Sequence, residues 1–109
     1  MNILITGATT SKAYQLERLL NRPDEIILAD SAELPAFLLK SKRFLKIPDE
    51  NASSFVHELL ALCLDHDVRE VYPLRPQEIA GLVSARLLFE EYGIKVMTPA
   101  DYSLEKSHD

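Results

Sequence analysis

Residues 1–12, MNILITGATTSK, contain the pattern that decides the fold. The run 1–6 is rich in Leu and Ile and ends at Gly7, as expected of a strand that is buried on both faces. Ser11 follows as a candidate N-cap of a helix. The apolar positions of that helix recur at helical spacing: Ala13, Leu16, Leu19 and Leu20. The opening of the chain therefore predicts a strand, a tight turn and a helix.

The same alternation continues to the end of the chain. We expect further strands at 25–29, 43–47, 70–74 and 94–98, and helices from Ser31 onward, at 51–67 and at 77–92. Asn51 or Ser53 is the candidate cap of the second of these helices, and the third has Tyr92 on its inward face and Gly93 as its C-cap. A strand, a helix and a further strand form a crossover unit, and crossover units join parallel strands. The sequence predicts one α/β domain over 1–100, an open doubly wound parallel sheet of about five strands with helices on both faces. Residues 101–109 read as the start of a linker or helix.

Composition excludes several classes of protein. The 109 residues carry 12 Lys and Arg against 17 Asp and Glu, a net charge of −5, so we expect no nucleic-acid partner. Apolar runs such as 26–29 are far shorter than the roughly 20 residues that span a bilayer, so no membrane segment is expected. A single cysteine, Cys63, cannot form an intramolecular disulfide, and the cytoplasm is the expected compartment.

Candidate site residues follow from the predicted sheet, because ligands of open parallel sheets bind beyond the carboxyl ends of the strands. The loop after the first strand offers backbone amides, hydroxyl groups and one cation, a combination that favours an anion such as phosphate or carboxylate. The alternative is that Gly7 only makes the turn and Ser11 only caps the helix. The candidates are Gly7, Ala8, Thr9, Thr10, Ser11 and Lys12 in this loop, Asp30 after the second strand, and Arg75, Gln77 and Glu78 after the fourth.

Asp30 also suggests a different ligand, because dinucleotide-binding domains place a ribose-binding acid at the end of the second strand. The glycine fingerprint is incomplete, however, since Thr10 and Ala13 stand where two of its small residues would be. An NAD(P)-binding module stays as an alternative. His57, Cys63 and His66 do not have the spacing of a metal site, and we expect neither a metal ion nor a catalytic nucleophile.

Several segments, taken in order, resemble the amino-terminal (pre-ATP-grasp) domain of ATP-grasp ligases, in particular the group similar to the carbamoyl-phosphate-synthase large subunit. The resemblance covers essentially the whole chain. Its most specific parts are Pro73 at the end of the fourth strand, Glu78 near the start of the next helix, YGIKV at 92–96 and the closing SHD at 107–109. The segments are MNILITGA (1–8), EIILAD (25–30), FLKIPDENAS (44–53), EVYPLRPQEIAGLVSARLLFEEYGIKVMTP (70–99) and SLEKSHD (103–109).

The resemblance implies a sheet of order 3-2-1-4-5 that forms the acceptor-substrate wall of an ATP-dependent carboxylate ligase. In such enzymes ATP converts a carboxylate into an acyl phosphate, which an amine or thiol then attacks. ATP and magnesium would be held by the following ATP-grasp domains, the expected partners, so this chain alone should bind no cofactor and catalyse no turnover. A homo-oligomer is also expected if the surface for those domains is exposed. A third hypothesis, a phospho-acceptor or protein-docking domain, lacks the acidic cluster that such a receiver needs after its first strand.

Overall fold

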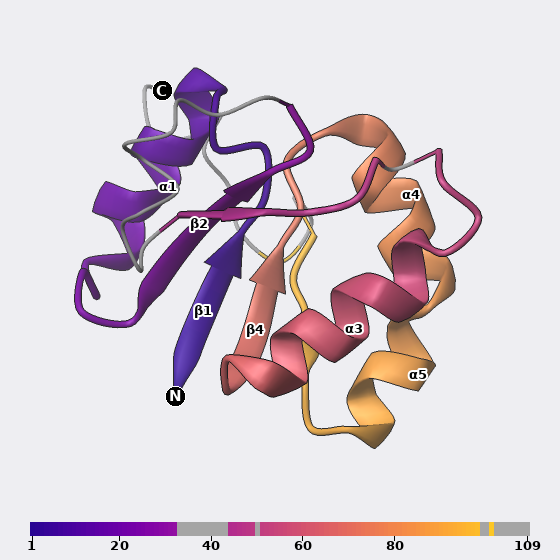
Figure 1. The fold of residues 1–109 in the computed structure, drawn as a ribbon. Coiled ribbons are helices and arrows are strands. Elements are labelled where there is room, and N and C mark those ends of the chain that lie inside the picture. The colour runs from indigo at the N-terminus through magenta and orange to yellow at the C-terminus, as the bar shows by residue number, and fades with distance from the viewer. Residues whose placement is uncertain (33–43, 50, 99–100, 102–109) are drawn as a thin grey trace.

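The computed structural model describes residues 1–32, 44–49, 51–98 and 101. α1, α3 and the pair α4–α5 each lie between two strands, as the sequence predicted (Figure 1). The elements are β1 (Asn2–Ile5), α1 (Ser11–Leu20), β2 (Ile26–Asp30), β3 (Phe44–Lys46), α3 (Phe55–Asp65), β4 (Val68–Tyr72), α4 (Pro76–Ser84), α5 (Arg86–Glu91) and β5 (Lys95–Val96). The helix expected from Ser31 falls, apart from Ser31 and Ala32, outside the described residues. Residues 102–109 also lie outside them.

The five strands form one parallel sheet in the order β3-β2-β1-β4-β5, which confirms the predicted α/β fold. β1 is the central strand, with Leu4 opposite Ile27 of β2 and Val71 of β4. Helix α1 covers one face of the sheet, and α3, α4 and α5 cover the other (Figure 1). The chain therefore changes winding direction at β1, between the crossovers to β2 and to β4.

Two apolar cores, one on each face of the sheet, explain why the strands read as continuous hydrophobic runs. Ile3 and Ile5 point to the α1 side, where Leu16 packs, while Leu4 points to the opposite core with Phe55. Side chains of a strand alternate between faces, so a strand buried on both faces needs apolar residues at every position. β1 meets this requirement, because Ile3, Leu4 and Ile5 are all buried.

Some predicted boundaries were wrong. β4 spans Val68–Tyr72 rather than 70–74, since Pro73 has no N–H for the sheet and the strand ends before it. The single helix expected at 77–92 is two helices, α4 and α5. They meet at Ala85, whose N–H bonds Leu82 O at 3.1 Å in a tightened turn. This break lets Phe89 enter the core and brings Arg86 within 3.1 Å of Val96 O.

The predicted helix ends were partly right. Gly93, with φ 76°, follows the last turn of α5, and the N–H groups of Gly93 and Ile94 bond Glu90 O and Phe89 O, both at 3.0 Å. This pairing is the Schellman motif, which needs a left-handed residue and so favours glycine. Tyr92, expected to point inward, is 50% exposed.

At the start of α1 and α3 the predicted caps were also wrong. Thr10 rather than Ser11 is the N-cap of α1, and Ser54 rather than Asn51 or Ser53 is the N-cap of α3. Leu19, placed on the inward face of α1 by its spacing, is half exposed. No helix in the described part of the chain is both long enough and apolar enough to span a membrane.

Candidate functional site

The carboxyl ends of β1, β2 and β4 bring five polar residues together at the point where the winding direction changes. We call Thr6, Thr9, Asp30, Arg75 and Glu78 the edge cluster. They come from the end of β1 and its following loop, from the last residue of β2, and from the start of α4. This is the region in which open parallel sheets bind their ligands.

Asp30 is the anionic centre of the edge cluster and is completely buried. Its Oδ2 accepts hydrogen bonds from Thr9 N at 2.9 Å and Thr9 Oγ1 at 2.6 Å, and its Oδ1 accepts one from Ala32 N at 3.1 Å. Burial raises the pKa of Asp30, but the hydrogen bonds from Arg75 and Thr9 outweigh burial and hold the pKa well below its usual range. Asp30 is therefore ionised at neutral pH.

Arg75 is the cation that pairs with Asp30, and it reaches across from the other side of β1. Its Nη2 donates to Asp30 Oδ2 at 2.9 Å and Oδ1 at 3.1 Å, and its Nε lies 3.3 Å from Oδ1. Nη2 also donates to Thr9 Oγ1 at 2.7 Å. Pro76 begins α4 directly after Arg75, which fixes the direction in which the chain leaves the sheet. The Arg75 side chain is 30% exposed and is the charged group of the edge cluster that faces solvent.

Gly7 makes the turn that places Thr9 over Asp30. Its φ of 67° is in the left-handed region, and a Cβ at this position would lie 3.3 Å from Leu74 Cβ and 3.5 Å from Arg75 Cγ. The carbonyl of Gly7 accepts hydrogen bonds from Thr10 N at 2.9 Å and Thr10 Oγ1 at 2.7 Å. Ala8 N bonds Ala29 O at 3.0 Å, which ties the loop to β2. Backbone geometry thus accounts for the glycine without a ligand.

Glu78 is the second buried carboxylate of the edge cluster, in the first turn of α4. Its Oε1 accepts a hydrogen bond from Thr6 Oγ1 at 2.5 Å and one from Arg75 N at 3.4 Å. Burial raises the pKa of Glu78 above its usual range, and the bond from Thr6 offsets this only in part. Among the described residues, Glu78 Oε2 is the one buried side-chain oxygen or nitrogen without a hydrogen-bond partner.

The sequence-predicted residues divide into two groups. Thr9, Asp30, Arg75 and Glu78 come together, and Gly7, Ala8 and Thr10 form the turn beneath them. Ser11, Lys12 and Gln77 are exposed at the starts of α1 and α4. Thr6 was missed, although a threonine that closes an otherwise apolar buried strand was a usable signal.

The hydrogen bonds of the edge cluster limit its chemistry. The Asp30 carboxylate, which a dinucleotide would need for its ribose, already accepts from Thr9, Ala32 and Arg75. The N–H of Thr9 and the hydroxyl of Thr10 are likewise used inside the protein. A small anion at this edge would instead meet the partly exposed side chain of Arg75 and the amino end of α1.

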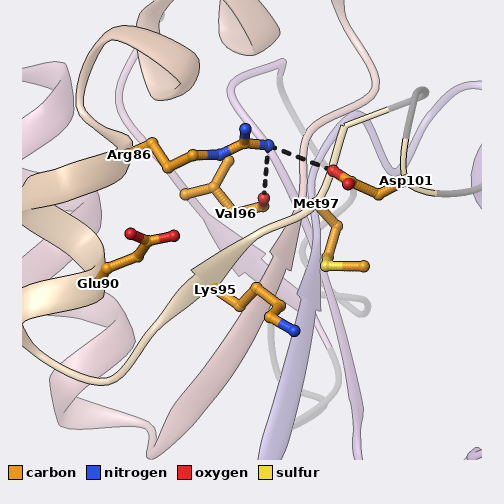
Figure 2. A pocket seen from close by; sticks show the side chains of 6 residues that line it. All are labelled: Arg86, Glu90, Lys95, Val96, Met97 and Asp101. Atoms are coloured by element: carbon orange, nitrogen blue, oxygen red, sulfur yellow. Dashed lines mark hydrogen bonds and ion pairs between the residues drawn. The ribbon is translucent and has the colours of Figure 1, made fainter.

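A separate small pocket lies beside β5 (Figure 2). Arg86 crosses it, and its Nη2 donates to Val96 O at 3.1 Å and to Asp101 Oδ2 at 3.2 Å. The cavity volume is about 190 Å³, below the range of pockets that enclose a drug-sized ligand. These contacts fasten the chain after β5 to α5, a structural role. The lining residues are Arg86, Glu90, Lys95, Val96, Met97 and Asp101.

Within the described ranges, no group of three or more His, Cys, Asp or Glu side chains could hold a metal ion. Burial raises the pKa of the Cys63 thiol to about 12, so this cysteine is not a nucleophile at neutral pH. No protein-family model matches the chain, and no curated protein matches it.

Proposed function

We propose that this chain is the amino-terminal, substrate-side domain of an ATP-dependent carboxylate ligase of the ATP-grasp type. The observation that carries the proposal is the pairing of Arg75 with Asp30 and Thr9 across the end of β1. This pairing occupies the acid that a dinucleotide would use, and the Arg75 side chain stays 30% exposed at this edge of the sheet. The strand order and the ordered sequence segments support the same assignment.

In this proposal the edge cluster binds one small substrate and holds no nucleotide. Arg75 and the amino end of α1 attract a carboxylate or phosphate group, because a guanidinium and the positive end of a helix dipole both favour anions. The bonds from Arg75 to Asp30 position the guanidinium at this edge before a ligand arrives. ATP and magnesium would be bound by the ATP-grasp partner domains, and the domain on its own would have no turnover. The cytoplasm is the compartment we propose, because Cys63 is a free, buried thiol and the chain has no second cysteine.

Two measurements test this proposal. The first is the coding sequence beyond the codon for Asp109, in which we expect ATP-grasp modules in frame or in a neighbouring gene. The second is calorimetric titration of the chain with NAD(H), NADP(H) and ATP, for which we expect dissociation constants weaker than about 10 μM. Micromolar binding of a nicotinamide dinucleotide, or an in-frame dehydrogenase domain, would show that the assignment is wrong.

A further inference from the structure

Glu78 has a fixed carboxylate with one free oxygen, and this oxygen lies inside the edge cluster. Thr6 Oγ1 and Arg75 N both bond Oε1, at 2.5 Å and 3.4 Å. The side chain is completely buried, yet Oε2 has no partner in the described part of the chain. A buried carboxylate oxygen without a hydrogen bond is costly, so such an atom at the edge where open parallel sheets bind their ligands indicates a missing donor.

The charges around Glu78 indicate what kind of donor is missing. The charged groups that act on it are Arg75 and Asp30, and these two already neutralise each other through their hydrogen bonds. An ionised Glu78 therefore gives the edge cluster a net charge of −1. A group that donates hydrogen bonds and carries one positive charge satisfies Oε2 and balances this charge.

We propose that Glu78 Oε2 accepts a hydrogen bond from the ammonium group of the acceptor substrate, which makes that substrate a primary amine. This inference rests on the proposed function and narrows it, because ligases of this type use either an amine or a thiol. A thiol is a weak donor without positive charge, and it would leave both the charge and the free oxygen of Glu78 poorly satisfied. Because Glu78 is completely buried, the proposal requires the ligand to displace a neighbouring side chain of the edge cluster, and Arg75, whose side chain is 30% exposed, is the candidate.

A substrate that also carries a carboxylate, such as an amino acid, fits both parts of the edge. Its ammonium would meet Glu78, while its carboxylate would meet the guanidinium of Arg75 or the amino end of α1. Thr6 then acts as a positioning residue, since its hydroxyl holds Oε1 and so directs Oε2. The substrate class is thus small zwitterions with a primary amine.

Nuclear magnetic resonance titration of the 109-residue chain tests the inference with three probes: glycine, methylammonium and glycolate. Glycolate is the matched control, since it keeps the carboxylate of glycine and replaces the ammonium with a hydroxyl. The readout is the ¹³Cδ shift of Glu78. We expect glycine and methylammonium to move this resonance saturably, with affinity that increases as the pH rises and Glu78 ionises, and glycolate to leave it unchanged.

Two variants complete the test. Glu78→Gln keeps the size of the side chain and removes its charge, and we expect it to weaken glycine binding at least tenfold. Glu91→Gln, at an exposed position at the end of α5, is the matched control and should bind glycine as the native chain does. If Glu78→Gln does not fold, the pH dependence and the Glu78 resonance of the native chain decide the question alone.

The inference is overturned if neither amine moves the Glu78 resonance, which is the result expected when only an ordered water occupies Oε2. It is also overturned if Glu78→Gln binds glycine as tightly as the native chain does. If glycolate still shifts the Arg75 side-chain signals in that case, the amine inference fails and the proposed function stands. If the amines fail and NAD⁺ binds at micromolar concentration, the proposed function fails as well.

Discussion

Replacing Asp30 with Asn should destabilise the protein by about 3 kcal/mol. The buried carboxylate accepts hydrogen bonds from Thr9 N, Thr9 Oγ1, Ala32 N and Arg75, and each bond to a charged group contributes about 1.5–3 kcal/mol. Asn keeps one acceptor oxygen but turns an NH₂ donor toward donors of the protein. A loss of about 3 kcal/mol lowers the melting temperature by roughly 12–24 °C in a domain of this size.

A double-mutant cycle isolates the contribution of the Arg75–Asp30 pair. Arg75→Gln alone should cost about 2 kcal/mol, less than Asp30→Asn, because Asp30 keeps its bonds from Thr9 and Ala32 and Arg75 is partly exposed. The double variant should lose less than the sum of the two, with a coupling energy of about 1.5 kcal/mol. Urea unfolding at pH 7, followed by circular dichroism, measures all four proteins. A coupling energy below about 0.5 kcal/mol would refute the reasoning that the two side chains act as a pair.

The same pair predicts a pH dependence. The pKa of Asp30 is lower in the folded protein than in the unfolded chain, so its contribution to stability is complete above the unfolded value of about 3.9. That contribution is lost as the pH falls below this value. The difference in unfolding free energy between the native protein and Asp30→Asn should therefore shrink below about pH 4. A difference that stays constant down to pH 2 contradicts the assignment of an ionised Asp30.

Three further predictions concern single residues. Burial raises the pKa of Glu78, so the native protein should lose stability relative to Glu78→Gln as the pH rises above about 4.3 through the folded pKa. An equal difference in unfolding free energy between the two proteins at pH 4 and pH 8 would contradict this. Gly7→Ala should cost about 1–3 kcal/mol of stability, because it combines a positive φ with a Cβ 3.3 Å from Leu74 Cβ. Gly81→Ala is the control: it lies in helix α4 with space for a methyl group, and it should be neutral or stabilising by up to about 1 kcal/mol. Thermal unfolding compares the two, and equal losses would count against the role given to Gly7. Cys63, whose pKa is about 12, should react with a thiol reagent only at the rate at which the protein opens; rapid labelling of the folded chain would show that it is accessible.

The alternation of apolar runs and helical spacing was sufficient to predict the sheet. Strands such as β1 are buried on both faces, and only apolar side chains at consecutive positions satisfy both cores. The boundaries were less predictable, because tertiary contacts set them. The break at Ala85, for example, depends on how Phe89 packs against the sheet and on the bond from Arg86 to Val96, neither of which is visible in local sequence.

The location of the site was predictable from topology, and its bonding was not. Asp30 ends β2 and Arg75 follows β4, and both strands neighbour β1, so the fold rule alone places both residues at one edge. The two residues are 45 positions apart in the sequence. Local sequence therefore does not show that they pair with each other rather than with a ribose or a phosphate. The burial of Glu78 likewise depends on how α4, which begins at Pro76, packs against the sheet. Local sequence does not show this packing.

The central claim is that the edge of the sheet accepts one small substrate and excludes a dinucleotide. The most direct test follows the backbone amide signals of the native chain while glycine or NAD⁺ is added in parallel. We expect glycine to shift the signals of 6–11 and 75–78, and NAD⁺ at about 1 mM to leave them in place. Saturable shifts of the same signals by micromolar NAD⁺, with none from glycine, would contradict it.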